Sequence, residues 1–185
     1  ASPFLVVAGA LLLWEAGVRL GGVPAYLLPP PSSIVARIVS DWRLLGAHTL
    51  VTTGEVLVGY LLAVVVSIPL AALLARFRPL ENALYPLLVA PQTVPKVAIA
   101  PLLVVWFGFG LLPKILIVFL ICFFPIVVDA LIGFRSVPRE VLWLSRWMGA
   151  SQWKTFRKIS IPAALPNIFA GLKVASTLAV VGAVV

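Results

Sequence analysis

The chain has 185 residues, of which 62% are hydrophobic and 11% charged, and its mean hydropathy is +1.15. Soluble domains are close to half apolar and a quarter charged, so this composition excludes an ordinary soluble protein and predicts an all-α, polytopic membrane protein. The formal net charge is +8. Because the basic residues lie between long apolar stretches, we interpret this charge as an orientation signal and expect no nucleic-acid partner.

The residue types that most often build catalytic or metal sites are scarce. Cys122 is the only cysteine and His48 the only histidine, which leaves no internal disulfide, no cluster of metal ligands and no catalytic arrangement. We therefore expect a protein that is not an enzyme and that binds neither metal nor cofactor through this chain. The sequence lacks an initiator Met and stops inside an apolar stretch at Val185, so we expect a fragment trimmed at both ends.

Five stretches approach the roughly 20 mostly apolar residues that a membrane-spanning helix needs. They are residues 4–20, 49–75, 83–107, 114–134 and 167–185. The third is interrupted by four prolines, Pro86, Pro91, Pro95 and Pro101. Proline removes a backbone donor, and such breaks persist in lipid only where neighbouring helices or a cavity satisfy the freed groups. We expect the third span inside the helix bundle, a single domain over residues 1–185, and a sixth span after Val185.

Residues 21–47 are expected to form an external segment at the membrane interface. They follow Glu15 and Arg19, whose i,i+4 spacing allows an ion pair. A proline run precedes Ser33, which we expect to cap a short amphipathic helix. The apolar positions of that helix are Ile34, Val35, Ile38, Val39 and Trp42. The helix lies either on the membrane surface or packed on the bundle as an ordinary loop helix.

Residues 135–166, which we call the basic loop, form a polar segment between two apolar stretches. The basic loop holds one acidic residue and six basic ones, Arg135, Arg139, Arg146, Lys154, Arg157 and Lys158. Arg76 and Arg78 fall on the same side of the membrane because two spans separate them from the loop, and Arg37, Arg43 and Lys114 fall on the other. The side of the basic loop thus has more arginine and lysine residues than the opposite side. This difference predicts that the basic loop and the N-terminus of the first span are cytoplasmic.

The basic loop has the pattern of two helices joined by a turn. Residues 137–148 have helical apolar spacing, Gly149 breaks the pattern, and Ser151 can cap a second helix that ends at Ile159. Four large aromatic side chains occur along it, Trp143, Trp147, Trp153 and Phe156. Aromatic residues interleaved with arginine are typical of a docking face. The alternative interpretation is an interfacial aromatic belt.

The basic loop resembles the cytoplasmic signature of bacterial ABC importer permeases. That signature is Glu-Ala-Ala, three free positions, Gly, nine free positions and Ile-x-Leu-Pro. Here the run from Gly149 to Ser151 is followed at the same spacing by Ile159, Ser160, Ile161 and Pro162, and then by Pro166. Ile161 replaces the leucine, and Trp143, Leu144 and Ser145 replace Glu-Ala-Ala. Four further stretches, LLPPPS at 27–32, PLA at 69–71, PKVAIAPL at 95–102 and WFGFG at 106–110, are similar to the nitrate, sulfonate and taurine branch, which also includes riboflavin and thiamine-precursor permeases.

The resemblance implies a type I permease homodimer in the bacterial plasma membrane, with separate ATP-binding subunits that hydrolyse ATP and an extracytoplasmic solute-binding protein. The basic loop would then be the coupling loop that docks onto the ATP-binding subunit. Its docking residues would be Arg146, Trp147, Gly149, Ala150, Ser151, Trp153, Lys154, Ile159 and Pro162. At the position of Glu55 the resemblance associates an acid with riboflavin or pyrimidine transport and an arginine with sulfonate transport.

Charged residues inside spans are costly and therefore are candidates for function. Those in this sequence are Glu55, Lys96, Asp129 and Lys173. We interpret Lys96, in the proline-rich span, as lining the pathway of a polar or anionic solute, with Glu55 and Asp129 as further lining candidates. The alternative is a structural ion pair between Lys96 and Asp129 or Glu55. Lys173 lies near the cytoplasmic end, where it can extend to the interface.

Two functions are compatible with these features. One is the permease subunit of an ATP-driven importer that works by alternating access, and the other is a self-contained secondary transporter or channel. Secondary transporters typically contain internal repeats with matching broken helices. The sequence has one broken span and no repeat, which favours the importer subunit.

Overall fold

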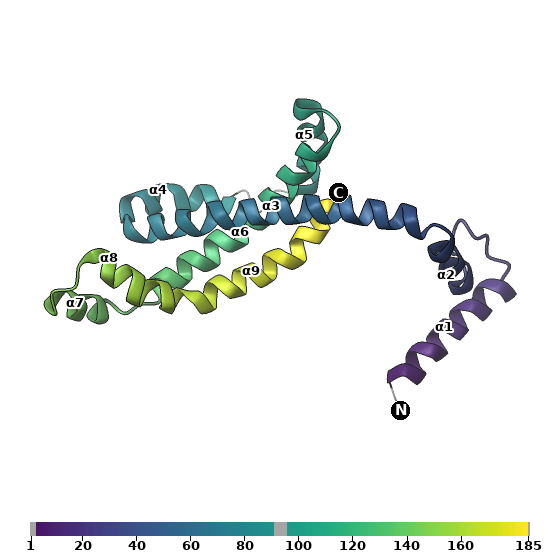
Figure 1. The fold of residues 1–185 in the computed structure, drawn as a ribbon, viewed down its shortest axis with the longest axis horizontal. Helices are drawn as coiled ribbons and strands as arrows, with labels where there is room; N and C mark the ends of the chain where they lie inside the picture. The colour runs from purple at the N-terminus through teal and green to yellow at the C-terminus, as the bar shows by residue number, and fades with distance from the viewer. Residues whose placement is uncertain (1–2, 91–95, 185) are drawn as a thin grey trace. The chain divides into compact units, whose positions relative to one another are not determined.

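The computed structural model describes residues 3–90 and 96–184, without the side chains of Lys96 and Val97. The chain divides into two compact units, Ala1–Val51 and Thr52–Val185. Figure 1 shows that the described residues are organised as helices joined by short connections. Helix α3 (Trp42–Arg76) begins in the first unit and continues into the second.

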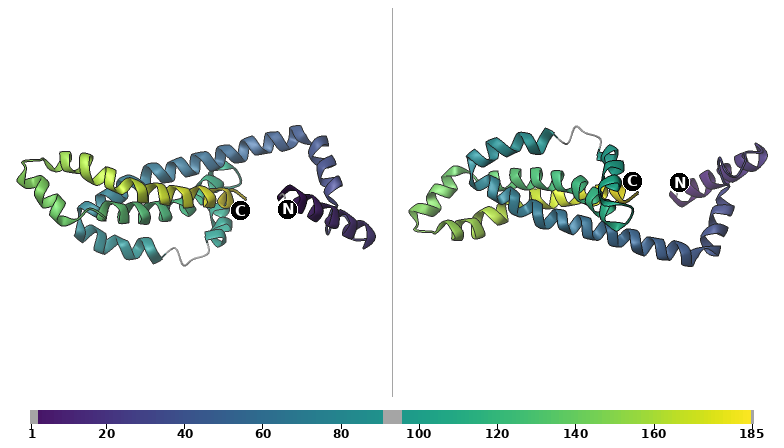
Figure 2. Two further views of the ribbon diagram at one scale, coloured as in Figure 1. Left: turned by 90° about the horizontal axis from the view of Figure 1, so that it is seen from below. Right: turned by 90° about the horizontal axis from the view of Figure 1, so that it is seen from above.

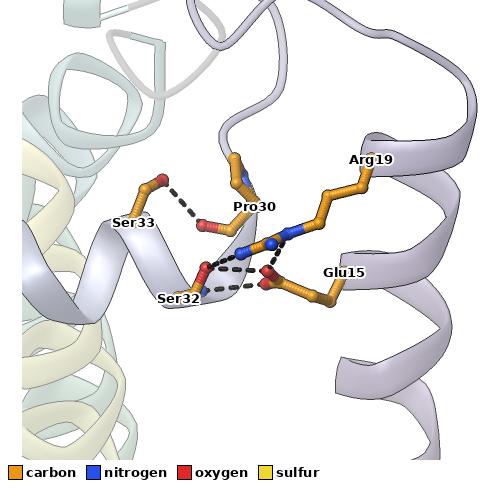
Figure 3. Close-up of polar contacts among 5 residues, drawn as sticks. All are labelled: Glu15, Arg19, Pro30, Ser32 and Ser33. Carbon is orange, nitrogen blue, oxygen red and sulfur yellow. Dashed lines mark hydrogen bonds and ion pairs between the residues drawn. The ribbon is translucent and has the colours of Figure 1, made fainter.

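The first unit contains α1 (Pro3–Leu20), α2 (Pro31–Ser40) and the start of α3. Glu15 and Arg19 form the predicted ion pair in α1, with 2.7 Å between Oε1 and Nε. The Glu15 carboxylate also accepts hydrogen bonds from the backbone N–H and the hydroxyl of Ser32, at 3.0 and 2.7 Å (Figure 3). These bonds join α1 to the first turn of α2.

The predicted cap of α2 is wrong. The helix begins at Pro31, and the Ser33 hydroxyl donates to the Pro30 carbonyl at 2.8 Å instead of accepting from the helix. The first turn of a helix has N–H groups without intrahelical partners and carries partial positive charge. Glu15 satisfies one of them, the N–H of Ser32, from a different helix. A long-range carboxylate therefore replaces the local serine cap.

The amphipathic segment is also shorter than predicted. Asp41 separates α2 from α3, and α3 already starts at Trp42. Trp42, predicted as the last apolar position of the amphipathic helix, therefore begins the long helix α3, which also contains residues 43–47. No residue in this stretch stops α3, because its one glycine, Gly46, weakens a helix without breaking it.

The second unit contains the rest of α3 and the helices that follow it. They are α4 (Arg78–Val89), η2 (Lys96–Ile99), α5 (Ala100–Phe107), α6 (Leu111–Arg135), α7 (Arg139–Trp147), α8 (Gln152–Thr155), η3 (Phe156–Ser160) and α9 (Ile161–Val184). Among the described residues, four helices are long and apolar enough to cross a membrane: α1, α3, α6 and the continuous helix Gln152–Val184. They correspond to the first, second, fourth and fifth predicted spans.

The third predicted span is not a single helix. It is divided into α4 with 12 residues and α5 with 8, with the short helix η2 between them, and each is shorter than a spanning helix requires. Pro101 lies in the first turn of α5, where a missing N–H costs little. Pro86 lies within α4 and does not end it, whereas Pro91 and Pro95 lie outside the described residues. A broken helix was predicted correctly, but Pro86 is not one of the breaks.

Helix α6 forms the centre of the second unit, and Figure 2 shows α9 alongside it with α3 against the pair. The side of α3 that faces α6 carries small residues every four positions, at Gly59, Ala63, Ser67 and Ala71, all buried. The side of α9 that faces α6 repeats this pattern at Gly171, Ala175, Ala179 and Ala183. Larger residues of α6 fill the space, among them Val118, Ile126 and Leu131. Small residues let helix backbones approach closely, which is how helices associate in lipid.

The close approach between α3 and α6 predicts a large effect of substituting Gly59. A Cβ atom at this position would lie 2.7 Å from Val118 Cβ and 2.8 Å from the Ile115 carbonyl oxygen. Gly59→Leu is therefore expected to destabilise the protein by about 2–3 kcal/mol through overpacking. At Gly54, on the same helix, an added Cβ would have no atom within 4 Å, and Gly54→Leu should leave thermal stability in detergent unchanged or slightly raised. Equal melting temperatures for the two variants would contradict the packing.

Candidate functional site

The first helix of the basic loop, α7, ends in a hydrogen-bonded turn that requires a glycine. Gly149 has a φ of +74°, in the left-handed region. Its N–H donates to the Arg146 carbonyl at 2.9 Å, and the N–H of Ala150 donates to the Ser145 carbonyl at 3.0 Å. These two bonds satisfy carbonyls that the helix end leaves free, as in a Schellman motif. The predicted break at Gly149 is thus confirmed, and it sets the direction in which the chain leaves α7.

The second helix starts as predicted but does not stop where predicted. Ser151 caps α8, because its Oγ accepts a hydrogen bond from the Lys154 N–H at 3.3 Å. The predicted end at Ile159 is wrong, since the helix continues from Gln152 to Val184 through the π-helical turn η3. A proline ring clashes with the carbonyl four residues earlier. For Pro162 that residue is Lys158, inside η3, where the wider turn provides room.

The two short helices of the basic loop are held to each other and to the ends of the spans. The hydroxyls of Ser145 on α7 and Thr155 on α8, both buried, lie 3.0 Å apart. Since the Ser145 hydrogen is donated to the Leu142 carbonyl, Thr155 is the donor of this pair. Arg76 Nη2, at the end of α3, donates to Gln152 Oε1 at 2.6 Å.

An aromatic contact connects the basic loop to α6, in addition to the two hydrogen-bonded contacts above. The rings of Phe134 and Phe156 are stacked with their centroids 5.7 Å apart. The basic loop is therefore connected to α3, to α6 and, through a continuous helix, to α9. The sequence alone did not predict these contacts, which are the hydrogen bond from Arg76 to Gln152 and the hydroxyl pair of Ser145 and Thr155. The one available signal was a small polar pair, Ser145 and Thr155, on helix faces that are otherwise apolar or charged.

The apolar side of α7 points away from the protein. Four large side chains form it, Trp143, Leu144, Trp147 and Met148, with exposed fractions of 58%, 61%, 88% and 78%. Large exposed apolar patches mark interaction sites. Among the predicted docking residues, Arg146, Trp147, Gly149, Ser151, Trp153, Lys154 and Pro162 are exposed, whereas Ala150 and Ile159 are partly buried. Leu144 and Met148 join this surface although the sequence analysis did not include them.

The charged residues of the spans do not meet at one place. Glu55 is buried on α3 and forms an ion pair with Lys114 on α6, with 3.3 Å between Oε1 and Nζ. Asp129 lies fifteen residues further along α6 than Lys114, or roughly 22 Å along the helix axis. Glu55 and Asp129 therefore lie at different positions along the axis of α6, too far apart to act on the same group. Lys114, interpreted from sequence as an orientation signal, is the ion-pair partner of Glu55.

The remaining intramembrane charges have different surroundings. Asp129 is half-buried and packs against α9, where a Cβ on Gly171 would lie 2.8 Å from Asp129 Cβ. Lys173 on α9 is exposed, and its extension to the membrane interface stays a prediction. The side chain of Lys96 lies outside the described part of the chain, although its backbone begins η2.

A further ion pair, which the sequence analysis missed, lies where α6 enters the basic loop. Arg135 at the end of α6 pairs with Glu81 Oε1 in the first turn of α4. The Glu81 side chain is only 4% exposed, and its Oε2 atom is buried without a hydrogen-bond partner in the described structure. This pair ties the end of α6 that enters the basic loop to the first fragment of the broken third span.

These features coincide with a known family. The binding-protein-dependent transport system inner membrane component family matches residues 63–185, more than half of the chain, and the match includes the whole basic loop. The chain belongs to this family of ABC importer permeases. The four apolar helices and the family together identify a multi-pass inner membrane protein.

Three relatives of this permease illustrate the branch. The riboflavin transport system permease protein RibX of Chloroflexus aurantiacus is 42% identical over 180 residues, which cover 95% of this chain and 66% of RibX. The formylaminopyrimidine transport permease protein ThiX of Halalkalibacterium halodurans is 38% identical, over 99% of this chain and 73% of ThiX. A probable ABC transporter permease protein of Haemophilus influenzae is 37% identical, over 99% and 75%. The permease sequence thus spans slightly less than two thirds of the length of RibX.

Proposed function

We propose that this permease is the membrane subunit of an ATP-driven importer, and that the basic loop docks onto a separate ATP-binding subunit. The observation that carries the proposal is the exposed apolar side of α7. Trp147 and Met148 leave most of their surface uncovered, in a loop whose basic residues favour the cytoplasmic side. Burying such side chains in a groove of a partner is the usual source of interface affinity.

The joints of the basic loop support its role as a mechanical coupler. A force applied to α7 would pass through the Ser145–Thr155 pair to α8, and from there through Gln152 to Arg76 on α3. The continuous helix from Gln152 to Val184 would carry it directly into the membrane. We propose that closure of the ATP-binding subunits moves these spans between inward-open and outward-open states. The permease performs no chemistry, and the ATP is bound and hydrolysed by its partner.

The complete assembly would contain a second copy of the permease and an extracytoplasmic solute-binding protein.

We propose a small heterocyclic solute as the cargo. RibX and ThiX, named for riboflavin and formylaminopyrimidine, are 42% and 38% identical, whereas the aliphatic sulfonate permease SsuC and the taurine permease TauC are 31% and 27% identical. Glu55 supports this choice, because the resemblance associates an acid at this position with heterocycle transport. Glu55, Asp129 and Lys96 are the proposed pathway residues.

Uptake by the reconstituted transporter tests this function. The permease is inserted in liposomes with its ATP-binding subunit and solute-binding protein, and uptake of labelled riboflavin, formylaminopyrimidine and taurine is measured. We expect uptake of one of the two heterocycles that requires both ATP and the ATP-binding subunit. Uptake driven by an ion gradient without that subunit would instead establish a secondary transporter. ATP-driven uptake restricted to taurine would refute the heterocyclic cargo alone.

A further inference from the structure

Two adjoining cavities lie where the basic loop meets the ends of the spans. The smaller, of about 220 Å³, is bordered by α7 and α8 of the loop and by the end of α3. The larger, of about 790 Å³, extends along the last turns of α3 and the first turns of α9. Both are lined by Arg76, Gln152 and Phe156, so they share a wall.

The two cavities differ sharply in chemistry. The larger is an apolar groove between membrane helices, lined by Ile68, Leu73, Ile161, Leu165 and Ile168 together with Trp153. The smaller is lined by two basic residues, Arg76 and Arg146, and by the hydroxyl-bearing residues Thr155 and Ser160, and Arg76 borders the larger cavity as well. Tryptophan and arginine are characteristic of the level at which the lipid headgroups begin. A ligand occupying both cavities would need an apolar chain on the membrane side and an anionic group under the loop.

No carboxylate of the described residues neutralises the positive charge of the smaller cavity. Within the described ranges, neither Arg76 nor Arg146 has a carboxylate within ion-pair distance. Arg76 uses Nη2 to donate to the neutral Gln152 side chain, and its guanidinium lies over the Phe77 ring at 5.3 Å. An arginine has five N–H donors, so most remain available to a phosphate, which it can bind in a bidentate manner.

We propose that these cavities together bind an anionic phospholipid of the cytoplasmic leaflet. Its phosphate would lie between Arg76 and Arg146, and an acyl chain would occupy the groove between α3 and α9. The apolar lining of the larger cavity suits an acyl chain, Trp153 suits the interface, and the two arginines of the smaller cavity suit a phosphate. A side chain of a cytoplasmic partner would not extend into the groove, because the groove runs alongside turns that belong to membrane spans.

This lipid would act at the mechanical joint. Arg76 belongs to α3 and Arg146 to α7, so a phosphate held by both would bridge a spanning helix and the helix that carries the exposed Trp147. Binding would thereby hold the basic loop against the spans. The proposal concerns lipid binding by the permease itself, and its test is independent of which solute is transported.

Lipid retention measured by native mass spectrometry tests the proposal. The assembled transporter is purified in detergent and incubated with dioleoyl phosphatidylglycerol or with phosphatidylcholine carrying the same acyl chains. We expect selective retention of phosphatidylglycerol. Arg76→Gln and Arg146→Gln should each weaken its binding by about fivefold, because one basic residue near a membrane surface contributes about that factor to the binding of anionic lipid.

Two further variants separate the two halves of the site. Arg157→Gln is the matched control, because Arg157 is an exposed base of the same loop that lines neither cavity, and it should retain the wild-type preference. Leu73→Trp places a larger side chain in the apolar groove and should reduce retention of both lipids without changing any charge. Equal retention of the two lipids by the wild type, or an equal loss in Arg157→Gln, would overturn the proposal. A disulfide between Leu165→Cys residues of two permease copies would assign the groove to the second copy instead.

Discussion

Replacing Gly149 with valine is expected to reduce ATP-driven uptake by at least about tenfold while leaving the permease inserted in the membrane. The left-handed φ of +74° is strained for residues with a Cβ, by about 1–2 kcal/mol, and more for a β-branched side chain. No atom lies within 4 Å of an added Cβ at this position. The effect would therefore arise from the backbone alone, through loss of the turn that sets the direction of α7 against α8, and a change of about 1.4 kcal/mol corresponds to a factor of ten.

Two control variants make this expectation specific. Gly149→Asn should retain most of the uptake, because asparagine tolerates the left-handed region better than other residues. Gly22 has a φ of +62° and equally open surroundings, but it lies in the first unit. Gly22→Val introduces the same kind of strain away from the basic loop and should leave the coupling of ATP hydrolysis to uptake intact. Wild-type uptake by Gly149→Val would show that the orientation of α7 is unimportant.

Replacing Arg135 with alanine is expected to have the second large effect. It leaves the buried Glu81 carboxylate without its cation, and removing one partner of a buried ion pair typically costs 3–5 kcal/mol. Because the Arg135 side chain is 52% exposed, we expect about 3 kcal/mol, at the lower end of that range. The melting temperature in detergent should fall by roughly 6–12 °C.

The rescue of this variant provides the decisive control. Adding Glu81→Gln to Arg135→Ala removes the uncompensated charge and should restore most of the lost stability. Arg139→Ala removes an exposed arginine one turn into the loop, for which no ion pair is present among the described residues, and should change the melting temperature little. If Arg139→Ala and Arg135→Ala are equally destabilised, the Glu81 pair does not hold α4 to α6.

The predictions from sequence that were confirmed are those that depend on local chemistry. The break at Gly149 and the cap at Ser151 are settled by hydrogen bonds within a few residues, so residue type and spacing are sufficient to predict them. The four long apolar spans follow from composition for the same reason. The predicted docking residues and pathway residues remain predictions, since their roles depend on partners.

The local predictions that failed were overridden from elsewhere in the chain. The Ser33 cap was replaced by Glu15, which is eighteen residues away on α1. The second loop helix does not end at Ile159 as predicted, because a π-helical turn accommodates Pro162 and lets the helix continue. Both cases obey the rules of helix ends and proline geometry, but the partner or backbone adjustment that satisfies them is not visible in the adjacent residues.

By itself, the sequence determined that this protein lies in a membrane, where its four long apolar helices are, and that residues 135–166 contain a helix break, aromatic residues and an excess of bases. Only the tertiary structure decided which charges pair, Glu55 with Lys114 and Glu81 with Arg135, and that Arg76 joins α3 to the basic loop. The physical reason is the distance along the chain over which the deciding interactions act. Helix formation and capping are governed by neighbours in the chain, whereas the partner of a buried charge is whichever group the packing of small-residue faces brings within a few ångströms.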